Sequence, residues 1–160
     1  MTASAATTPA ATTPAGTTPE NPIDSPTGWV AEQISAYLET NGAKPDFRNG
    51  TPLLLLTVRG RKSGLWQRTA LICGEDAGRY LIVASMGGAP KHPLWYLNLT
   101  ANPEVRLQVK DRVMTAIART ATAEEKPALW QKVVGVYPDY ADYQRKTERE
   151  IPIVILDPVK

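Results

Sequence analysis

Three cations and a hydroxyl gather within six residues, Arg59-Gly60-Arg61-Lys62-Ser63-Gly64. An apolar run precedes them, so we expect them at a strand end, in a turn that the glycines and the serine favour. Positive charge, hydroxyl donors and close backbone approach are what a phosphate or a polycarboxylate requires. The spacing is not that of a P-loop, and basic hairpin tips are commonly just solvated. Anion binding and a solvated tip therefore both stay open.

A second candidate site is the small-residue stretch Ala84-Ser85-Met86-Gly87-Gly88-Ala89, which leads into Pro90–Tyr96. A strand would end here in an amide-rich turn and enter a helix, whose N-terminus favours negative charge. Lys91 adds a formal cation. Trp95 could pack on a flat, isoalloxazine-like ring, although filling the core is the commoner use of a tryptophan.

Three tyrosines, Tyr137, Tyr140 and Tyr143, recur at three-residue steps. On a helix this spacing puts all three phenols in one sector. Such a face suits a pocket that grips a planar polar molecule and donates hydrogen bonds to it. The alternative is a surface helix whose tyrosines are half-buried.

The scarcity of metal-binding side chains excludes several kinds of chemistry. The chain has one cysteine, Cys73, and one histidine, His92. A disulfide framework, a cysteine metal cluster and a multi-histidine metal site are therefore excluded within one chain, and we expect no metal. Cys73 is expected to be a small buried apolar residue. A Ser-His-Asp triad would need His92, which has no nucleophile motif nearby.

Composition and charge narrow the remaining possibilities. The 160 residues are 42% hydrophobic, enough for one domain with its own core. A net charge of +2 is too small to favour nucleic acid as a partner. Apolar runs such as Leu53–Leu56 are far shorter than a membrane span, and the N-terminus lacks the pattern of a secretory signal. We expect a reduced, cytoplasmic protein.

The chain divides into a leader and one domain. Residues 1–27 are rich in Thr, Ala and Pro and predict a disordered leader, and residues 28–160 predict a single domain. Hydrophobic periodicity predicts helices and strands in an α+β fold, a small barrel of about six mostly antiparallel strands with flanking helices. The expected helices are 29–40, 91–100, 122–136 and 138–149, and the expected strands are 51–58, 68–73, 80–85, 104–110, 113–119 and 151–156.

These motifs, in this order, resemble the deazaflavin-dependent nitroreductase family, a branch of the split β-barrel flavin-binding superfamily. The resemblance covers about residues 45–158. It rests on the following stretches: Gly60-Arg-Lys-Ser-Gly64, Ala84-Ser85, Gly87-Gly-Ala89, Pro93-x-Trp-Tyr-x-Asn-Leu99, Asn102-Pro103, Tyr137-Pro-x-Tyr-x-x-Tyr143 and Ile151-Pro-Ile-Val154.

The resemblance implies a split β-barrel and the deazaflavin coenzyme F420, which in its reduced form donates a hydride. By analogy, Arg61, Lys62 and Ser63 would hold the phosphate and the polyglutamate tail. Ser85, Tyr137, Tyr140 and Tyr143 would face the substrate over the deazaflavin ring. The cofactor groove would be lined by Gln67, Arg68, Thr69, Ala70, Leu71, Ile72, Val83, Ala84, Ser85, Met86, Lys91, Leu94, Trp95, Tyr96, Leu97, Asn98 and Tyr140.

The sequence departs from the family at a few of these positions. The family often has Lys in place of Met86, Pro in place of Ala70, and an aromatic residue at or near Ile72 or Cys73. Loss of the Lys removes one phosphate cation, which Arg68 or Lys91 could replace. The changes at 70–73 would reshape the substrate pocket.

The expected activity is hydride transfer from reduced F420 to a small electrophilic acceptor: a quinone, an activated alkene or enone, or a nitroaromatic. Two alternatives stay open, an FMN-binding split-barrel oxidoreductase and a non-catalytic F420 carrier. A quinone acceptor would make peripheral contact with the membrane plausible. The oligomeric state does not follow from the sequence.

Overall fold

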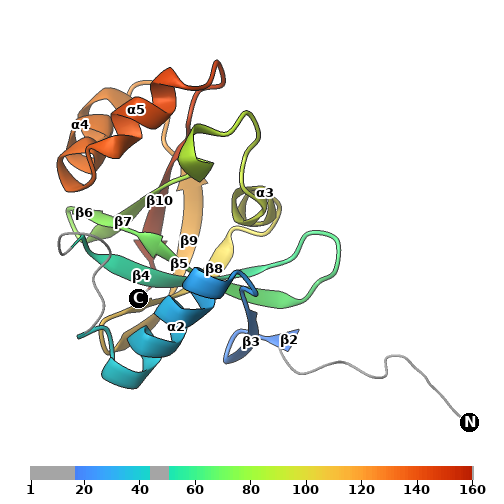
Figure 1. Cartoon of the computed structure of the whole chain (residues 1–160). Helices are drawn as coiled ribbons and strands as arrows, with labels where there is room; N and C mark the ends of the chain where they lie inside the picture. Colours follow the sequence, from blue (N-terminus) through green and yellow to red (C-terminus); the bar gives the residue numbers. More distant parts are fainter. Residues whose placement is uncertain (1–16, 44–50, 160) are drawn as a thin grey trace, which may run out of the picture.

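The computed structural model describes residues 17–43 and 51–159, which form one nine-stranded sheet with helices packed around it (Figure 1). The strand order is β2-β3-β5-β4-β8-β9-β10-β7-β6. Every pairing is antiparallel except that of β3 with β5. The strands are β2 (Thr17–Thr18), β3 (Asn21–Asp24), β4 (Leu53–Arg59), β5 (Trp66–Ile72), β6 (Gly74–Asp76), β7 (Arg79–Val83), β8 (Glu104–Val109), β9 (Arg112–Thr120) and β10 (Ile153–Pro158). The helices are α2 (Gly28–Thr40), α3 (Leu94–Ala101), α4 (Lys126–Val136) and α5 (Asp139–Arg145), with a short 3-10 turn, η3 (Met86–Gly88).

The α+β class is confirmed, but the expected number of about six strands is too small for the described residues. All six expected strands are present, and three short strands, β2, β3 and β6, join them. β6 lies in the segment between Gly74 and Gly78. The glycines and acidic residues of this segment are typical of a loop, so the sequence did not predict a strand here. It forms because its backbone pairs with β7, a contact that no local pattern reveals.

The predicted disorder of the leader is wrong for its last part. Ile23 of β3 pairs in parallel with Gln67 of β5, and Asp24 pairs with Arg68. The Arg68 side chain donates to the two Asp24 carboxylate oxygens at 2.6 and 3.1 Å. A polar segment can thus be ordered by backbone and ionic bonds without burying much apolar surface. Residues 1–16 lie outside the described part of the chain.

The sheet buries apolar side chains on both faces of β4. Leu54, Leu56 and Val58 point into the inner core, whereas Leu53 and Leu55 point to the opposite face, against α2. The strand is therefore buried on both faces from Leu53 to Val58, and Thr57 is the one polar residue within this stretch.

Two helical layers cover the outside of the sheet in different places. In Figure 1, α2 lies over β5 and the α4–α5 pair lies over β7 and β10. On α2, the Tyr37 hydroxyl donates to the Leu53 carbonyl at 3.2 Å and accepts from the Lys110 amide at 2.6 Å. Because these bonds are buried, they hold α2 firmly against the β4 side of the sheet.

The helix α4 begins later than predicted, at Lys126 rather than near Thr122. The expected capping box is nevertheless formed, since Thr122 and Glu125 exchange side-chain-to-backbone bonds of 2.9 and 3.2 Å. Pro127 then falls in the first turn of the helix, where its missing N–H removes no helical bond.

Candidate functional site

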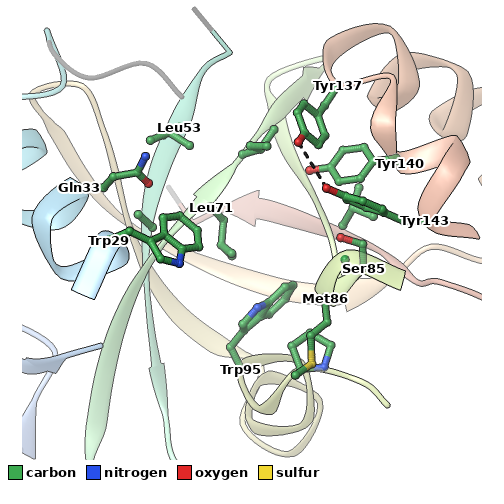
Figure 2. A pocket seen from close by; sticks show the side chains of 15 residues that line it. Trp29, Gln33, Leu53, Leu71, Ser85, Met86, Trp95, Tyr137, Tyr140 and Tyr143 are labelled. Carbon is green, nitrogen blue, oxygen red and sulfur yellow. Dashed lines mark hydrogen bonds between the residues drawn. The ribbon is translucent and has the colours of Figure 1, made fainter. Parts of the chain in front are cut away.

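A cavity of about 440 Å³ lies between α2 and α5, where the two helical layers face each other; we call it the tyrosine cavity. Figure 2 shows Tyr137, Tyr140 and Tyr143 on one side, Trp29 and Gln33 on the opposite side, and Ser85, Met86 and Trp95 nearer its lower edge. The cavity is lined by Trp29, Gln33, Leu53, Ala70, Leu71, Ile72, Val83, Ser85, Met86, Gly87, Pro93, Trp95, Tyr137, Tyr140 and Tyr143.

The three tyrosines form one cluster, although only Tyr140 and Tyr143 lie on α5 and Tyr137 precedes it in an extended conformation. Their ring centroids lie 5.1 to 6.3 Å apart, and the Tyr137 and Tyr143 hydroxyls are 3.4 Å from each other. Burial raises the pKa of Tyr140, and burial together with the Tyr143 hydroxyl raises the pKa of Tyr137. These phenols therefore keep their protons at neutral pH and can act as hydrogen-bond donors.

Two hydroxyls on buried residues face the cavity without an internal partner. Tyr140 is 5% exposed and Ser85 is 7% exposed. Neither hydroxyl forms a hydrogen bond with any residue that the structure describes, and Figure 2 shows both directed towards the cavity. Such groups in a largely apolar wall are suited to bind a polar atom of a ligand.

Ser85 is placed by the turn η3, which packs closely on α5. Met86, Gly87 and Gly88 have positive φ angles of 46°, 65° and 85°. A Cβ on Gly88 would lie 2.8 Å from the Tyr143 carbonyl oxygen. Glycine at this position is therefore required both by the left-handed conformation and by the close approach to the tyrosine helix.

A second cavity, of about 450 Å³, adjoins the first and shares Met86, Pro93 and Trp95 with it; we call it the α3 cavity. Its lining continues along β5 from the residues that line the tyrosine cavity. The ordered end of the leader closes its far wall. The α3 cavity is lined by Ile23, Asp24, Ser25, Pro26, Thr27, Val58, Gln67, Arg68, Thr69, Met86, Pro93, Leu94 and Trp95.

The basic turn, residues 59–64, joins β4 to β5 at the far end of this path. Arg61 and Lys62 are exposed, and neither belongs to an ion pair among the described residues. The Arg61 amide donates to the Asn98 side chain at 3.1 Å, which ties the turn to α3. The Ser63 hydroxyl accepts from the Leu65 amide at 3.1 Å within the turn.

The expected groove residues fall into two groups. Twelve of them line the cavities: Ala70, Leu71, Ile72, Val83, Ser85 and Tyr140 in the tyrosine cavity, Gln67, Arg68, Thr69 and Leu94 in the α3 cavity, and Met86 and Trp95 in both. The others lie outside both cavities. These are Arg61, Lys62, Ser63, Ala84, Lys91, Tyr96, Leu97 and Asn98.

The residues outside the cavities have other contacts. Ala84 is completely buried, and its amide donates to the Pro152 carbonyl. The Tyr96 hydroxyl pairs with the Thr120 hydroxyl at 2.8 Å, on the other side of α3. Arg68 is engaged with Asp24, so it is not a free replacement for the cation lost at Met86.

Only some of the positions at which this sequence differs from the family pattern line the tyrosine cavity. Ala70, Ile72 and Met86 line it, whereas Cys73 belongs to the inner core. Burial raises the pKa of the Cys73 thiol to about 12, so the thiol is an inert apolar group, as expected.

Several cavity residues were not predicted from the sequence. Trp29 and Gln33 lie on α2, but their helical spacing could not show that this face meets α5 across a cavity. The Gln33 Oε1 atom is buried and has no hydrogen-bond partner among the described residues. Arg149 was also missed, although it contacts Ser85, as discussed below.

A largely apolar aromatic cavity with free hydroxyls continues into a second cavity and then towards exposed cations. This combination defines a protein that binds an extended cofactor with a flat ring at one end and negative charge at the other. Among the described residues, no group of three metal-binding side chains is present, and no helix is long and apolar enough to cross a membrane.

Comparisons with known proteins identify the family. The model of the F420H(2)-dependent quinone reductase family matches residues 29–158. The F420H(2)-dependent quinone reductase Rv1261c of Mycobacterium tuberculosis (strain H37Rv) is 39% identical over 124 residues, covering 75% of this chain and 83% of the relative. A solved F420-H2 dependent reductase, FDR-A, is 45% identical with a TM-score of 0.62, over 66% of this chain and 94% of its own. A structure described as a domain-swapped dimer is 44% identical with a TM-score of 0.64, over 83% and 100%.

The chain belongs to the F420H(2)-dependent quinone reductase family. It is an F420-dependent oxidoreductase that uses reduced F420 as hydride donor and a small molecule as acceptor. These relatives support the reductase over the FMN-binding and the non-catalytic alternatives.

Proposed function

We propose that this reductase transfers a hydride to a quinone in the tyrosine cavity, and that Ser85 and Tyr140 bind the acceptor oxygen. The free hydroxyls of these two buried residues are the observation that carries the proposal. A quinone has a flat apolar body and carbonyl oxygens, which match aromatic walls and hydroxyl donors. Enones and nitroaromatics share part of this chemistry and are the next candidates.

The two cavities and the basic turn fit the parts of F420 in order. Strand β5, of seven residues, spans roughly 20 Å at about 3.3 Å per residue, and it passes from the tyrosine cavity through the α3 cavity towards the turn. The ring would lie in the tyrosine cavity, beside Trp95. Arg61, Lys62 and Ser63 would hold the phosphate and the polyglutamate tail, since neither Arg61 nor Lys62 forms an ion pair with another described residue. Reduced F420, when bound, supplies the hydride from its C5 carbon.

The protein's own residues orient the acceptor and stabilise charge on it. Because burial keeps the phenols of Tyr137 and Tyr140 protonated, they can donate to an oxygen that becomes negative as hydride arrives. The aromatic and aliphatic walls keep water away from this oxygen and strengthen that bond.

We also propose that the curved sheet is a split β-barrel. Residues of β5 and of β7, which lie in different halves of the sheet order, line the same cavity. A peripheral membrane contact stays a prediction from the acceptor class, and sedimentation with anionic lipid vesicles would test it.

The proposal is tested by titrating the protein with F420 and then following oxidation of reduced F420 with a panel of quinones, enones and nitroaromatics. We expect tight binding and fastest turnover with quinones. Binding without turnover of any acceptor would contradict the proposed activity, and a faster enone or nitroaromatic would replace quinone as the acceptor class.

A further inference from the structure

The linker between α5 and β10 carries a side chain that reaches back to the wall of the tyrosine cavity. Arg149 donates to the Ser85 carbonyl and to the Ala89 carbonyl, each at 2.8 Å. Its Nη1 lies 3.0 Å from Nδ1 of His92. Because a guanidinium can only donate, Nδ1 accepts this bond, which makes His92 neutral with its proton on Nε2. One side chain therefore joins both ends of the turn 85–89 to the segment that enters α3.

Arg149 is itself held by the tyrosine helix. The side-chain amide of Gln144, the residue after Tyr143, donates to the Arg149 carbonyl at 2.8 Å and accepts from the Ile151 amide at 2.9 Å. The Gln144 side chain thus holds the linker backbone directly after the Cα atom that carries the guanidinium. Through Gln144 and Arg149, the tyrosine wall and the Ser85 turn of the cavity belong to one hydrogen-bond network.

The turn has a conformation that needs support from outside. Ser85 is right-handed and is followed by three left-handed residues, of which Met86 carries a side chain. A left-handed conformation is unfavourable for a residue with a Cβ and persists where surrounding contacts hold it.

This conformation also arranges three backbone donors. The N–H groups of Ser85, Met86 and Gly87 donate to no acceptor among the described residues, and all three residues line the tyrosine cavity. A right-handed residue followed by a left-handed one turns neighbouring N–H groups to the same side and forms a concave donor surface. Since Arg149 donates to the Ser85 carbonyl, it polarises the peptide whose other end is the Met86 N–H.

We propose that Arg149 is the positioning residue of the tyrosine cavity. It holds the 85–89 turn so that the Ser85 hydroxyl and the three N–H groups face the ligand, and it sets the distance between this turn and the tyrosines. Arg149 lines neither cavity, so it acts through the turn and not by contact with the reacting atoms. The consequence for catalysis rests on the proposed function.

The test compares Arg149→Met, which keeps the apolar stem, with Arg149→Lys, which keeps the charge. Arg145→Met is the matched control, because Arg145 is exposed and pairs only with Asp142 among the described residues. We expect Arg149→Met to lower kcat by about 10- to 100-fold, as small displacements of positioned groups do. Arg149→Lys should recover part of this loss, and Arg145→Met should match the wild type.

Amide hydrogen exchange in the protein without cofactor gives a readout that does not depend on activity. Arg149→Met should speed exchange of the Gly88 and Ala89 amides, whose bonds to the Ser85 and Met86 carbonyls close the turn, and leave β10 unchanged. If Arg149→Met folds poorly, His92 provides a second pair of variants. His92→Asn keeps an acceptor near the Nδ1 position and His92→Leu removes it, so the Asn variant should retain more turnover.

Two different failures can be told apart. A wild-type protein that binds F420 but reduces no acceptor would contradict the proposed function alone, and the exchange experiment would still decide the role of Arg149. Wild-type kcat and wild-type exchange in Arg149→Met, or equal losses in the Met and Lys variants, would overturn the positioning role.

Discussion

The tyrosine cavity and the basic turn are built in opposite ways. The turn is six consecutive residues, 59–64, whose cations stand in solvent. The cavity draws its lining from α2, β5, β7, η3 and α5, and its hydroxyls belong to buried residues such as Ser85 and Tyr140. Charges in the turn act through water and salt, whereas donors in the cavity act where water is excluded.

This difference predicts that the two regions control different steps, cofactor binding and turnover. The turn should contribute to cofactor affinity, because a mobile tail can meet exposed cations in many geometries. The cavity should control turnover, because the acceptor oxygen must meet donors whose positions are already set.

The largest expected effect is that of Tyr140→Phe. Removing the buried donor should lower kcat by about 10- to 100-fold and change F420 affinity little. Steady-state oxidation of reduced F420 and a fluorescence titration measure the two quantities. Tyr96→Phe is the matched control, because its hydroxyl pairs with Thr120 outside both cavities. If Tyr140→Phe and Tyr96→Phe lost kcat equally, the position of a phenol inside or outside the cavity would not matter for turnover.

A smaller effect is expected for Lys62→Ala in the turn. The dissociation constant for F420 should rise by about 3- to 10-fold at low salt, since an exposed charge contributes modestly. The difference should shrink at high ionic strength, and kcat at saturating cofactor should stay near the wild-type value. Titration at two salt concentrations measures this, with Lys132→Ala on α4 as the control. If Lys62→Ala weakened F420 binding equally at both salt concentrations, or lowered kcat instead, Lys62 would act as a cavity residue and not as a solvent-exposed charge.

Gln33 gives a third comparison, within the cavity itself. Its Oε1 is buried with no partner in the part of the chain that the structure describes, so Gln33→Leu should raise the free energy of unfolding of the cofactor-free protein by about 1 kcal/mol. Urea unfolding measures this change. The exposed Gln131 on α4 provides the control, and Gln131→Leu should be neutral. A destabilised Gln33→Leu would mean that the amide contributes to packing in the free protein.

The smallest expected effect on the site comes from Glu125, which belongs to neither region. The Arg119 guanidinium and the Thr122 amide lower the pKa of this carboxyl from 4.5 to about 2. Its stabilising contribution is therefore present above about pH 4.5 and is lost as pH falls towards about 2. Thermal unfolding across this range should show a loss that Glu125→Gln lacks, with turnover at neutral pH unchanged. A pH-independent difference between the two proteins would contradict this ionic origin.

Much of the fold could be predicted, because the side-chain pattern of most strands and helices is visible within the segment itself. The apolar run 51–58 marks β4, and the alternation in 104–110 marks β8, since side-chain period follows directly from burial. The strands β2, β3 and β6 could not be predicted, because they are held by pairing with distant backbone and not by their own side chains.

The sequence by itself determined the family, the cofactor class and the three local motifs: the basic turn, the glycine turn with Ser85, and the tyrosine helix. Each motif consists of neighbouring residues, so it can be seen in the sequence, and the family and cofactor class follow from the resemblance that the motifs carry together. Only the tertiary structure decided that Ser85 and Tyr140 share a cavity with Trp29 and Gln33, and that Arg149 holds the turn at its wall. These contacts join residues that are far apart in the chain, and the packing of α2 and α5 on different parts of the sheet brings them together.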